Sequence, residues 1–199
     1  MTELIEFILI FSACILIIIW LAFFIRRIAL FFSLHKLKKQ SDTDIKITFL
    51  PALFLPFTAK KPLATVRVRK KLFDIYLYNG GGRGRFVHIA NEKFTVVFSK
   101  LGGMASKGAS RTLGTNKRVI INLPSGVGRA KVRLLPEIKE DSNTPLLVFS
   151  PTPAELTYVT EERTSIKVAF TGERIGKWQI FTKDTLSRYL DRESRGFFD

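Results

Sequence analysis

The chain of 199 residues predicts an all-β fold, an antiparallel sandwich or barrel-like domain with one short C-terminal helix, preceded by a single N-terminal transmembrane helix. Two observations lead to this prediction. An uncharged apolar run covers residues 7–25 and stops at Arg26 and Arg27. The rest of the chain consists of short segments in which apolar and polar residues alternate, separated by Gly, Pro, Asn and Ser, as is typical of β-strands.

The apolar run has the length of one membrane crossing. A helix rises about 1.5 Å per residue, so roughly 20 apolar residues cross the hydrocarbon core of a bilayer. Glu3 and Glu6 occupy the place where a cleaved signal peptide carries basic residues, which favours an anchor that is retained. A core helix of a globular protein is the other reading, but such helices carry a polar stripe that this run lacks.

The basic residues near the run all follow it, which predicts the orientation of the anchor. By the positive-inside rule, residues 40–199 are expected in the cytoplasm. The single cysteine, Cys14, lies inside the run, so the domain has no disulfide framework, as expected in a reducing compartment. The residues predicted at the membrane interface are Trp20, Arg26, Arg27, Lys36, Lys38 and Lys39.

Residues 28–39 mix apolar and basic side chains and allow two interpretations. In the first, the helix leaves the membrane along the interface, with its apolar side toward the acyl chains and its lysines toward lipid phosphates. In the second, the helix simply continues into a solvated basic flank. We therefore divide the chain into a membrane anchor with its basic juxtamembrane segment, 1–39, and a basic β-rich domain, 40–199. The acidic polar stretch 137–144 could separate two lobes of that domain.

Eleven segments of the domain have the alternation of β-strands. Because the connections between them are short, we expect them to pair antiparallel. Near the C-terminus, Asp184 is suited to begin a helix and Gly196 to end it, with Leu186 and Leu190 on one face. The predicted strands are 44–50, 64–71, 73–79, 85–90, 93–99, 117–123, 129–135, 145–150, 155–160, 164–170 and 176–182.

Positive charge is concentrated in the first part of the domain. Residues 40–136 contain 18 Lys and Arg against 4 Asp and Glu, whereas residues 137–199 contain 9 against 11. A local excess of this size points to an anionic partner. Alternation places the cations of two strands on one face, and if those strands are neighbours they form a single cationic surface; otherwise they are ordinary solvated residues. The residues concerned are Arg67 and Arg69 on one strand, and Arg129, Lys131 and Arg133 on the other.

Two glycine-rich loops carry further cations. The loop 79–85 contains Asn-Gly, which predicts a β-hairpin, and its Arg83 and Arg85 lie next to aromatic residues that could stack on single-stranded nucleic acid. The loop 100–117 has no acidic residue, and its Lys107 and Arg111 could hold a phosphate, although the sequence favours a mobile loop between strands over a phosphate site.

No pattern of catalytic or metal-binding residues is present. The only histidines, His35 and His88, are far apart in the sequence, and the chain has no G-x-S-x-G motif. We therefore expect no enzyme, no metal and no cofactor. The predicted function is that of a membrane-anchored binding, adaptor or assembly protein whose partner is anionic lipid headgroups or an acidic protein surface. The alternative is a membrane-tethered protein that binds nucleic acid.

Overall fold

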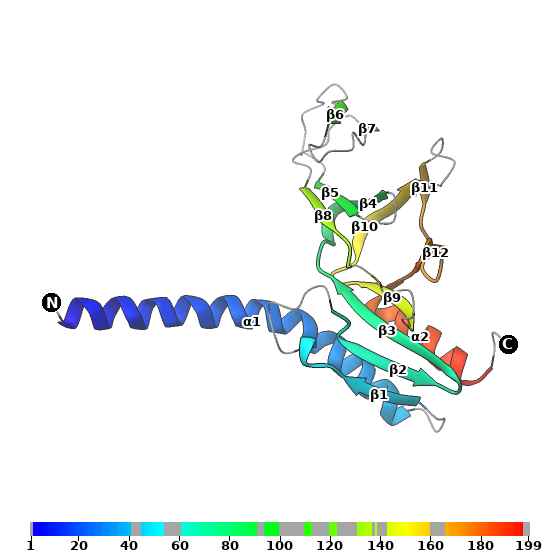
Figure 1. The fold of residues 1–199 in the computed structure, drawn as a ribbon, viewed down its shortest axis with the longest axis horizontal. Coiled ribbons are helices and arrows are strands. Elements are labelled where there is room, and N and C mark those ends of the chain that lie inside the picture. The colour runs from blue at the N-terminus through cyan, green and yellow to red at the C-terminus, as the bar shows by residue number, and fades with distance from the viewer. Residues whose placement is uncertain are drawn as a thin grey trace.

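The computed structural model describes residues 2–40, 45–53, 61–90, 94–99, 110–112, 120–122, 131–136, 138, 143–159 and 166–196. Two helices, a six-stranded sheet and a five-stranded sheet form successive layers (Figure 1). The N-terminal half of the first helix projects from these layers, and only its second half runs along them (Figure 1). The prediction of a mainly β domain with an apolar helix before it and a short helix at its end is confirmed.

The elements have the following bounds. The helices are α1 (Thr2–Gln40), η1 (Pro51–Leu53, a 3-10 turn) and α2 (Lys183–Ser194). The strands are β1 (Ile45–Phe49), β2 (Ala64–Val68), β3 (Lys71–Tyr78), β4 (Gly82–Ala90), β5 (Phe94–Ser99), β6 (Ser110–Thr112), β7 (Ile120–Asn122), β8 (Lys131–Leu134), β9 (Thr144–Phe149), β10 (Pro153–Val159), β11 (Ile166–Val168), β12 (Arg174–Ile175) and β13 (Trp178–Thr182).

Both large sheets are mixed, so the prediction of purely antiparallel pairing was wrong. The six-stranded sheet has the order β1-β2-β3-β9-β13-β12, and its strands β3, β9 and β13 run parallel to one another. The five-stranded sheet has the order β11-β10-β4-β5-β8, in which β10 and β4 are parallel. Parallel pairing arises because several short connections lead from one sheet to the other instead of to the neighbouring strand. Each sheet takes strands from both sides of the stretch 137–144.

The turn after Tyr78 is one of these connections between sheets. The sequence predicts a hairpin there, but β3 and β4 lie in different sheets, and the turn passes the chain from one to the other. The backbone packs tightly against a second connection, because the Gly82 N–H donates to the Thr152 carbonyl (3.2 Å). A Cβ on Gly81 would lie 1.8 Å from the Pro151 carbonyl oxygen, so only glycine fits. The glycines thus permit two crossing connections to touch.

Each face of the six-stranded sheet has its own apolar core. One face packs on the helices, through residues such as Val66, Leu146 and Leu190. The other face packs on the five-stranded sheet, where Leu147, Val87 and Trp178 lie in one cluster, so the two sheets have a sandwich-like arrangement. Strand β9 is buried on both faces, which explains its continuous run of apolar residues instead of an alternation.

Some short elements had no signal in the sequence. Strand β12 has two residues, β6 has three, and neither is long enough to establish an alternation. Helix α2 begins after Thr182, not after Asp184, because the Thr182 N–H donates to the Thr185 hydroxyl (3.0 Å) and Thr182 itself is extended. Gly196 follows the helix with a positive φ of 79°, as a glycine after a helix end commonly does.

Candidate functional site

Helix α1 has two halves with opposite environments. The window Leu4–Leu21 has a mean hydropathy of 2.9, is long and apolar enough to cross a membrane, and none of it is buried inside the protein. In the second half, Leu30, Leu34 and Leu37 are buried in the core beneath the six-stranded sheet. The side of residues 28–39 that carries Leu30, Leu34 and Leu37 therefore faces the domain and not a lipid interface, whereas Phe32 on another side of the helix is exposed. One continuous helix joins the exposed apolar half to the domain.

Arg27 lies at the boundary between these halves, and its side chain points into the protein. It is 3 % exposed and donates through Nη1 to the carbonyl oxygen of Ala52, with the Leu53 carbonyl oxygen at 3.4 Å. Burial lowers the pKa of the guanidinium to about 10, so it stays charged at neutral pH. The sequence placed this cation at the lipid surface, but its charge is used inside the protein, where it satisfies backbone carbonyls of η1.

The other residues predicted at an interface have varied surroundings. Trp20 is exposed and stacks on Phe24, with 4.8 Å between ring centroids. Lys36, Lys38 and Lys39 are exposed near the end of α1, on the part of the helix that accompanies the domain. Arg26 belongs to α1, but its side chain lies outside the described residues.

The two predicted basic strands are not neighbours. Arg67 and Arg69 belong to β2 and the turn that follows it, in the six-stranded sheet, whereas Lys131 and Arg133 belong to β8, an edge strand of the five-stranded sheet. They therefore form two separate basic regions instead of one surface. Arg129 lies outside the described residues.

The basic region at β2 is engaged with α2. Arg69, whose φ of 52° places it in the tight turn between β2 and β3, donates through Nε to the Ser194 carbonyl (3.1 Å). Lys71 forms an ion pair with the buried carboxylate of Glu193. Two cations of the β2–β3 turn thus hold the C-terminal end of α2, where the helix dipole is negative.

The remaining predicted cations are spread over other elements. Arg85 is exposed on β4, next to the stacked pair Phe86 and Phe98 (5.5 Å). Arg83 lies on β4 and Arg111 on β6, but their side chains lie outside the described residues, and so does Lys107. The predictions of nucleic-acid stacking at 83–85 and phosphate binding at 100–117 therefore stay predictions.

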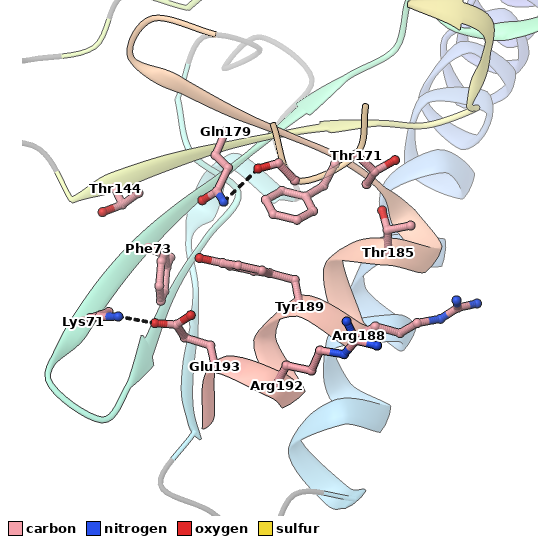
Figure 2. Close-up of a pocket in the computed structure, with 12 residues that line it drawn as sticks. Lys71, Phe73, Thr144, Thr171, Gln179, Thr185, Arg188, Tyr189, Arg192 and Glu193 are labelled. Carbon is pink, nitrogen blue, oxygen red and sulfur yellow. Dashed lines mark hydrogen bonds and ion pairs between the residues drawn. The ribbon is translucent and has the colours of Figure 1, made fainter. Parts of the chain in front are cut away.

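A groove beside α2 is a concave site that brings several polar side chains together (Figure 2). It has a volume of about 730 Å³, within the range of binding sites for small molecules or short segments of chain. Its aromatic lining is Phe73, Phe181 and Tyr189; the Tyr189 ring is partly exposed and packs on the two phenyl rings, which are buried. The polar lining consists of Lys71, Thr144, Thr171, Gln179, Thr185, Arg188, Arg192 and Glu193.

The charge of this groove is positive. Among the described residues that line it, Glu193 alone is acidic and is paired with Lys71, whereas Arg188 and Arg192 lie one helical turn apart on the rim. The Gln179 amide donates to the Gly172 carbonyl (3.1 Å) and lies across from the Tyr189 ring (Figure 2). Burial, and then the Glu193 carboxylate, raise the pKa of the Tyr189 hydroxyl, so it remains a neutral hydrogen-bonding group. The groove suits an acidic group that carries an apolar portion.

Sequence reasoning missed Lys71, Arg188 and Arg192. A signal for the arginines was available, because their i, i+4 spacing on an amphipathic helix places both on one polar face. Nothing in the local sequence placed Lys71 beside them, since the two segments are 122 residues apart at the Lys71–Glu193 pair.

Comparisons with known proteins do not assign the chain to a family. No protein-family model, no curated protein and no solved structure matches this chain. Within the described residues, no group of three or more His, Cys, Asp and Glu side chains is placed to hold a metal ion.

Proposed function

We propose that this protein is a single-pass membrane-anchored binding or adaptor protein, with residues 40–199 on the cytoplasmic side, whose basic domain engages an anionic partner. The observation that carries the proposal is the division of α1. Over Leu4–Leu21 the helix is apolar and unburied, whereas at Leu30, Leu34 and Leu37 it is part of the core. Such a helix is suited to hold one half in lipid and the other in a folded domain.

The continuity of α1 favours a retained anchor over a core helix or a cleaved signal sequence. A core helix would be buried, and none of the window Leu4–Leu21 is. Cleavage as a signal sequence would cut the helix next to Arg27, which is buried and bonded to Ala52. With no flexible linker between span and core, the domain would be held at the bilayer surface.

We assign the groove beside α2 to an acidic segment of a partner protein. In Figure 1, α2 and the turn between β2 and β3 lie at the end of the domain away from the N-terminal half of α1. Lipid at the end of the span would not reach the groove, so an anion bound there must come from elsewhere. The rim charges of Arg188 and Arg192 supply the recognition, and the partly exposed ring of Tyr189 receives an apolar side chain.

The anchor can be tested on the native membrane. The chain should stay with membranes in alkaline carbonate, and a thiol reagent that cannot cross membranes should label an R174C variant, in a Cys14→Ser background, from the cytoplasmic side alone. Arg174 is exposed in the domain, so a substitution there is tolerated. Release by carbonate contradicts the anchor, and labelling from the opposite side contradicts the orientation.

The groove can be tested with a defined acidic probe. The full chain in neutral nanodiscs is titrated with a fluorescent peptide of alternating Glu and Leu, and with a fluorescent single-stranded RNA. The variant R188Q/R192Q should weaken peptide binding severalfold, since each exposed ion pair contributes roughly 0.2–1 kcal/mol. The variant K167Q/R174Q removes the same charge elsewhere and should leave peptide binding unchanged. Equal loss in both variants, or RNA binding that exceeds peptide binding, would favour the nucleic-acid alternative.

A further inference from the structure

The edge strand β8 combines exposed apolar and basic side chains. Leu134 is 70 % exposed and Val132 is 37 % exposed, although their neighbours on β5, Phe94 and Val96, are at least partly covered. Lys131 is exposed and Arg133 is partly exposed, and because side chains alternate along a strand, both lie on the opposite face from Val132 and Leu134. Within the described strands, β8 pairs with β5 alone. An exposed apolar edge strand is an aggregation hazard in water, so a surface that covers it has a clear physical benefit.

The position of β8 identifies that surface. Figure 1 shows β8 on the side of the domain that faces the N-terminal half of α1, whereas β11 and β12 lie on the opposite side. The turn η1, which Arg27 contacts, lies on the same side as β8. A bilayer crossed by Leu4–Leu21 would therefore have its surface next to both η1 and β8.

The attachment of α1 to the domain fixes this geometry. Arg27 is bonded to η1, and Leu30 and Leu34 are almost completely buried against the six-stranded sheet. The two sheets are in turn joined by a buried hydrogen bond between the hydroxyls of Tyr78 and Thr95. In the five-stranded sheet, β8 pairs directly with β5, the strand that carries Thr95. The domain cannot rotate freely about the anchor, so the same edge always faces the bilayer.

We propose that β8 is a second membrane contact that approaches the bilayer by its edge, so that Leu134 and Val132 enter the interface on one side of the strand and Lys131 and Arg133 pair with anionic lipid headgroups on the other. The inference rests on the proposed function, because it requires α1 to span the membrane. The apolar side chains leave water, and the cations gain the attraction of an anionic leaflet, so both kinds of residue on β8 favour the contact. This contact would set the tilt of the domain and direct the groove beside α2 away from the lipid.

Charge favours lipid over a second copy of the chain as the occupant of this edge. Pairing β8 with the β8 of another molecule would gather Lys131 and Arg133 from both copies along one ladder. Like charges across neighbouring strands destabilise a sheet. Anionic headgroups supply the opposite charge, and the interface accepts leucine and valine beside it.

The test measures the depth of single fluorescent labels in nanodiscs. In a Cys14→Ser background, the variants I10C, L134C and R174C of the full chain carry an environment-sensitive dye, and the lipids carry nitroxide quenchers at the headgroup or along the acyl chain. The label at 134 should be quenched severalfold more by the headgroup nitroxide than the label at 174. The label at 10 should be quenched by the acyl-chain nitroxide and serves as the control for the span.

The outcomes separate the inference from the proposed function. Quenching at 10 with equal, weak quenching at 134 and 174 would overturn the contact of β8 and leave the anchor intact. Absence of quenching at 10 would overturn both. Rapid disulfide formation between L134C chains would show that a second copy covers the edge, and this too would overturn the inference.

Charge substitutions test the headgroup part of the proposal. With anionic phosphatidylserine in the nanodisc, K131Q/R133Q should reduce the quenching at 134 to the level found in neutral phosphatidylcholine. The matched variant K167Q/R174Q, which removes two exposed cations from β11 and β12, should keep the wild-type quenching. Equal effects of the two variants would contradict a specific contact of β8.

Discussion

The guanidinium of Arg27 donates a hydrogen bond to the carbonyl oxygen of Ala52, 25 residues further along the chain. The donor lies in α1 at the end of the apolar half, and the acceptor lies in η1 at the edge of the domain. This bond fastens the helix to the fold at the level where the apolar half ends. The Leu30, Leu34 and Leu37 contacts continue the attachment along the rest of the helix.

Replacing Arg27 by methionine should destabilise the domain by about 2–3 kcal/mol. Methionine keeps much of the apolar stem but leaves buried carbonyl oxygens without a charged donor. Thermal or denaturant unfolding of the full chain in detergent measures this effect. K38M removes an exposed cation from the same helix and should change the stability by less than about 0.5 kcal/mol. Similar values for the two variants would contradict the role of Arg27.

Replacing Leu34 by alanine should cost about 2–5 kcal/mol, because truncation removes apolar contact and leaves a cavity between α1 and the sheet. Leu34 is 1 % exposed, so water cannot readily fill the cavity that the truncation leaves. F32A is the control, since Phe32 lies two residues away on the exposed side of the helix. A greater loss of stability for F32A than for L34A would contradict this prediction, because it would mean that the exposed side of the helix contributes more than the side packed on the core.

His88 should make the stability depend on pH. The imidazole is 3 % exposed, its Nδ1 lies 3.0 Å from the Thr157 hydroxyl, and none of the described residues bonds to its Nε2. Burial lowers the pKa of His88 below its ordinary value of 6.5. Between the two pKa values the unfolded chain binds the proton and the folded chain does not. The contribution of neutral His88 is therefore complete above pH 6.5 and is lost as the pH falls through the lower, folded pKa.

Urea unfolding between about pH 7.5 and pH 5 measures this dependence. The variant H88Q cannot take up a proton, so its free energy of unfolding should fall less steeply with decreasing pH than that of the wild type. Parallel pH profiles for the two proteins would show that other groups cause the change.

The hydroxyl pair between Tyr78 and Thr95 should couple the two sheets. Y78F and T95V should each destabilise the domain by about 1 kcal/mol, and the double variant should lose less than the sum because the shared bond is removed once. A double-mutant cycle by denaturant unfolding gives the coupling. A coupling energy of zero would mean that the bond does not contribute to the association of the sheets.

The pKa of Tyr189 should report the state of the groove. Burial raises it first and the Glu193 carboxylate raises it further, so E193Q should move it toward the ordinary value near 10. Tyrosine-specific ¹³C NMR follows the titration. The pKa of Tyr76, which burial and Asp74 raise, should be unchanged in the same spectrum. Equal shifts of both tyrosines would indicate a general loosening of the fold.

The sequence was sufficient to predict the helices and strands that have a clear local pattern of apolar and polar residues. Alternation in Thr65–Val68 identified a strand because its valines face a core and Arg67 faces solvent, and the run Phe94–Phe98 identified another by its β-branched and aromatic residues. The apolar run of α1 identified a helix by length and composition alone. Amphipathic spacing of Leu186 and Leu190 identified α2.

Contacts between residues that are far apart in the sequence could not be predicted from the local pattern of apolar and polar residues. Nothing near Arg27 indicates that its acceptor is Ala52, and an arginine after an apolar run has the same sequence whether it faces lipid or protein. The parallel pairing of β3 with β9 depends on which sheet each connection enters. The basic region of β2 had the composition of a binding surface, yet Arg69 is used to hold the end of α2.

The contact of α1 with α2 brings the earliest and latest helices of the chain together. During synthesis, residues 30–37 leave the ribosome long before residues 183–194, and strand β9 must still enter the middle of its sheet. Leu30 and Leu34 then have neither α2 nor the complete sheet to cover them. The nascent chain thus exposes an apolar face of α1 until α2 is made, and a chain truncated before α2 would keep that face exposed and be prone to aggregation.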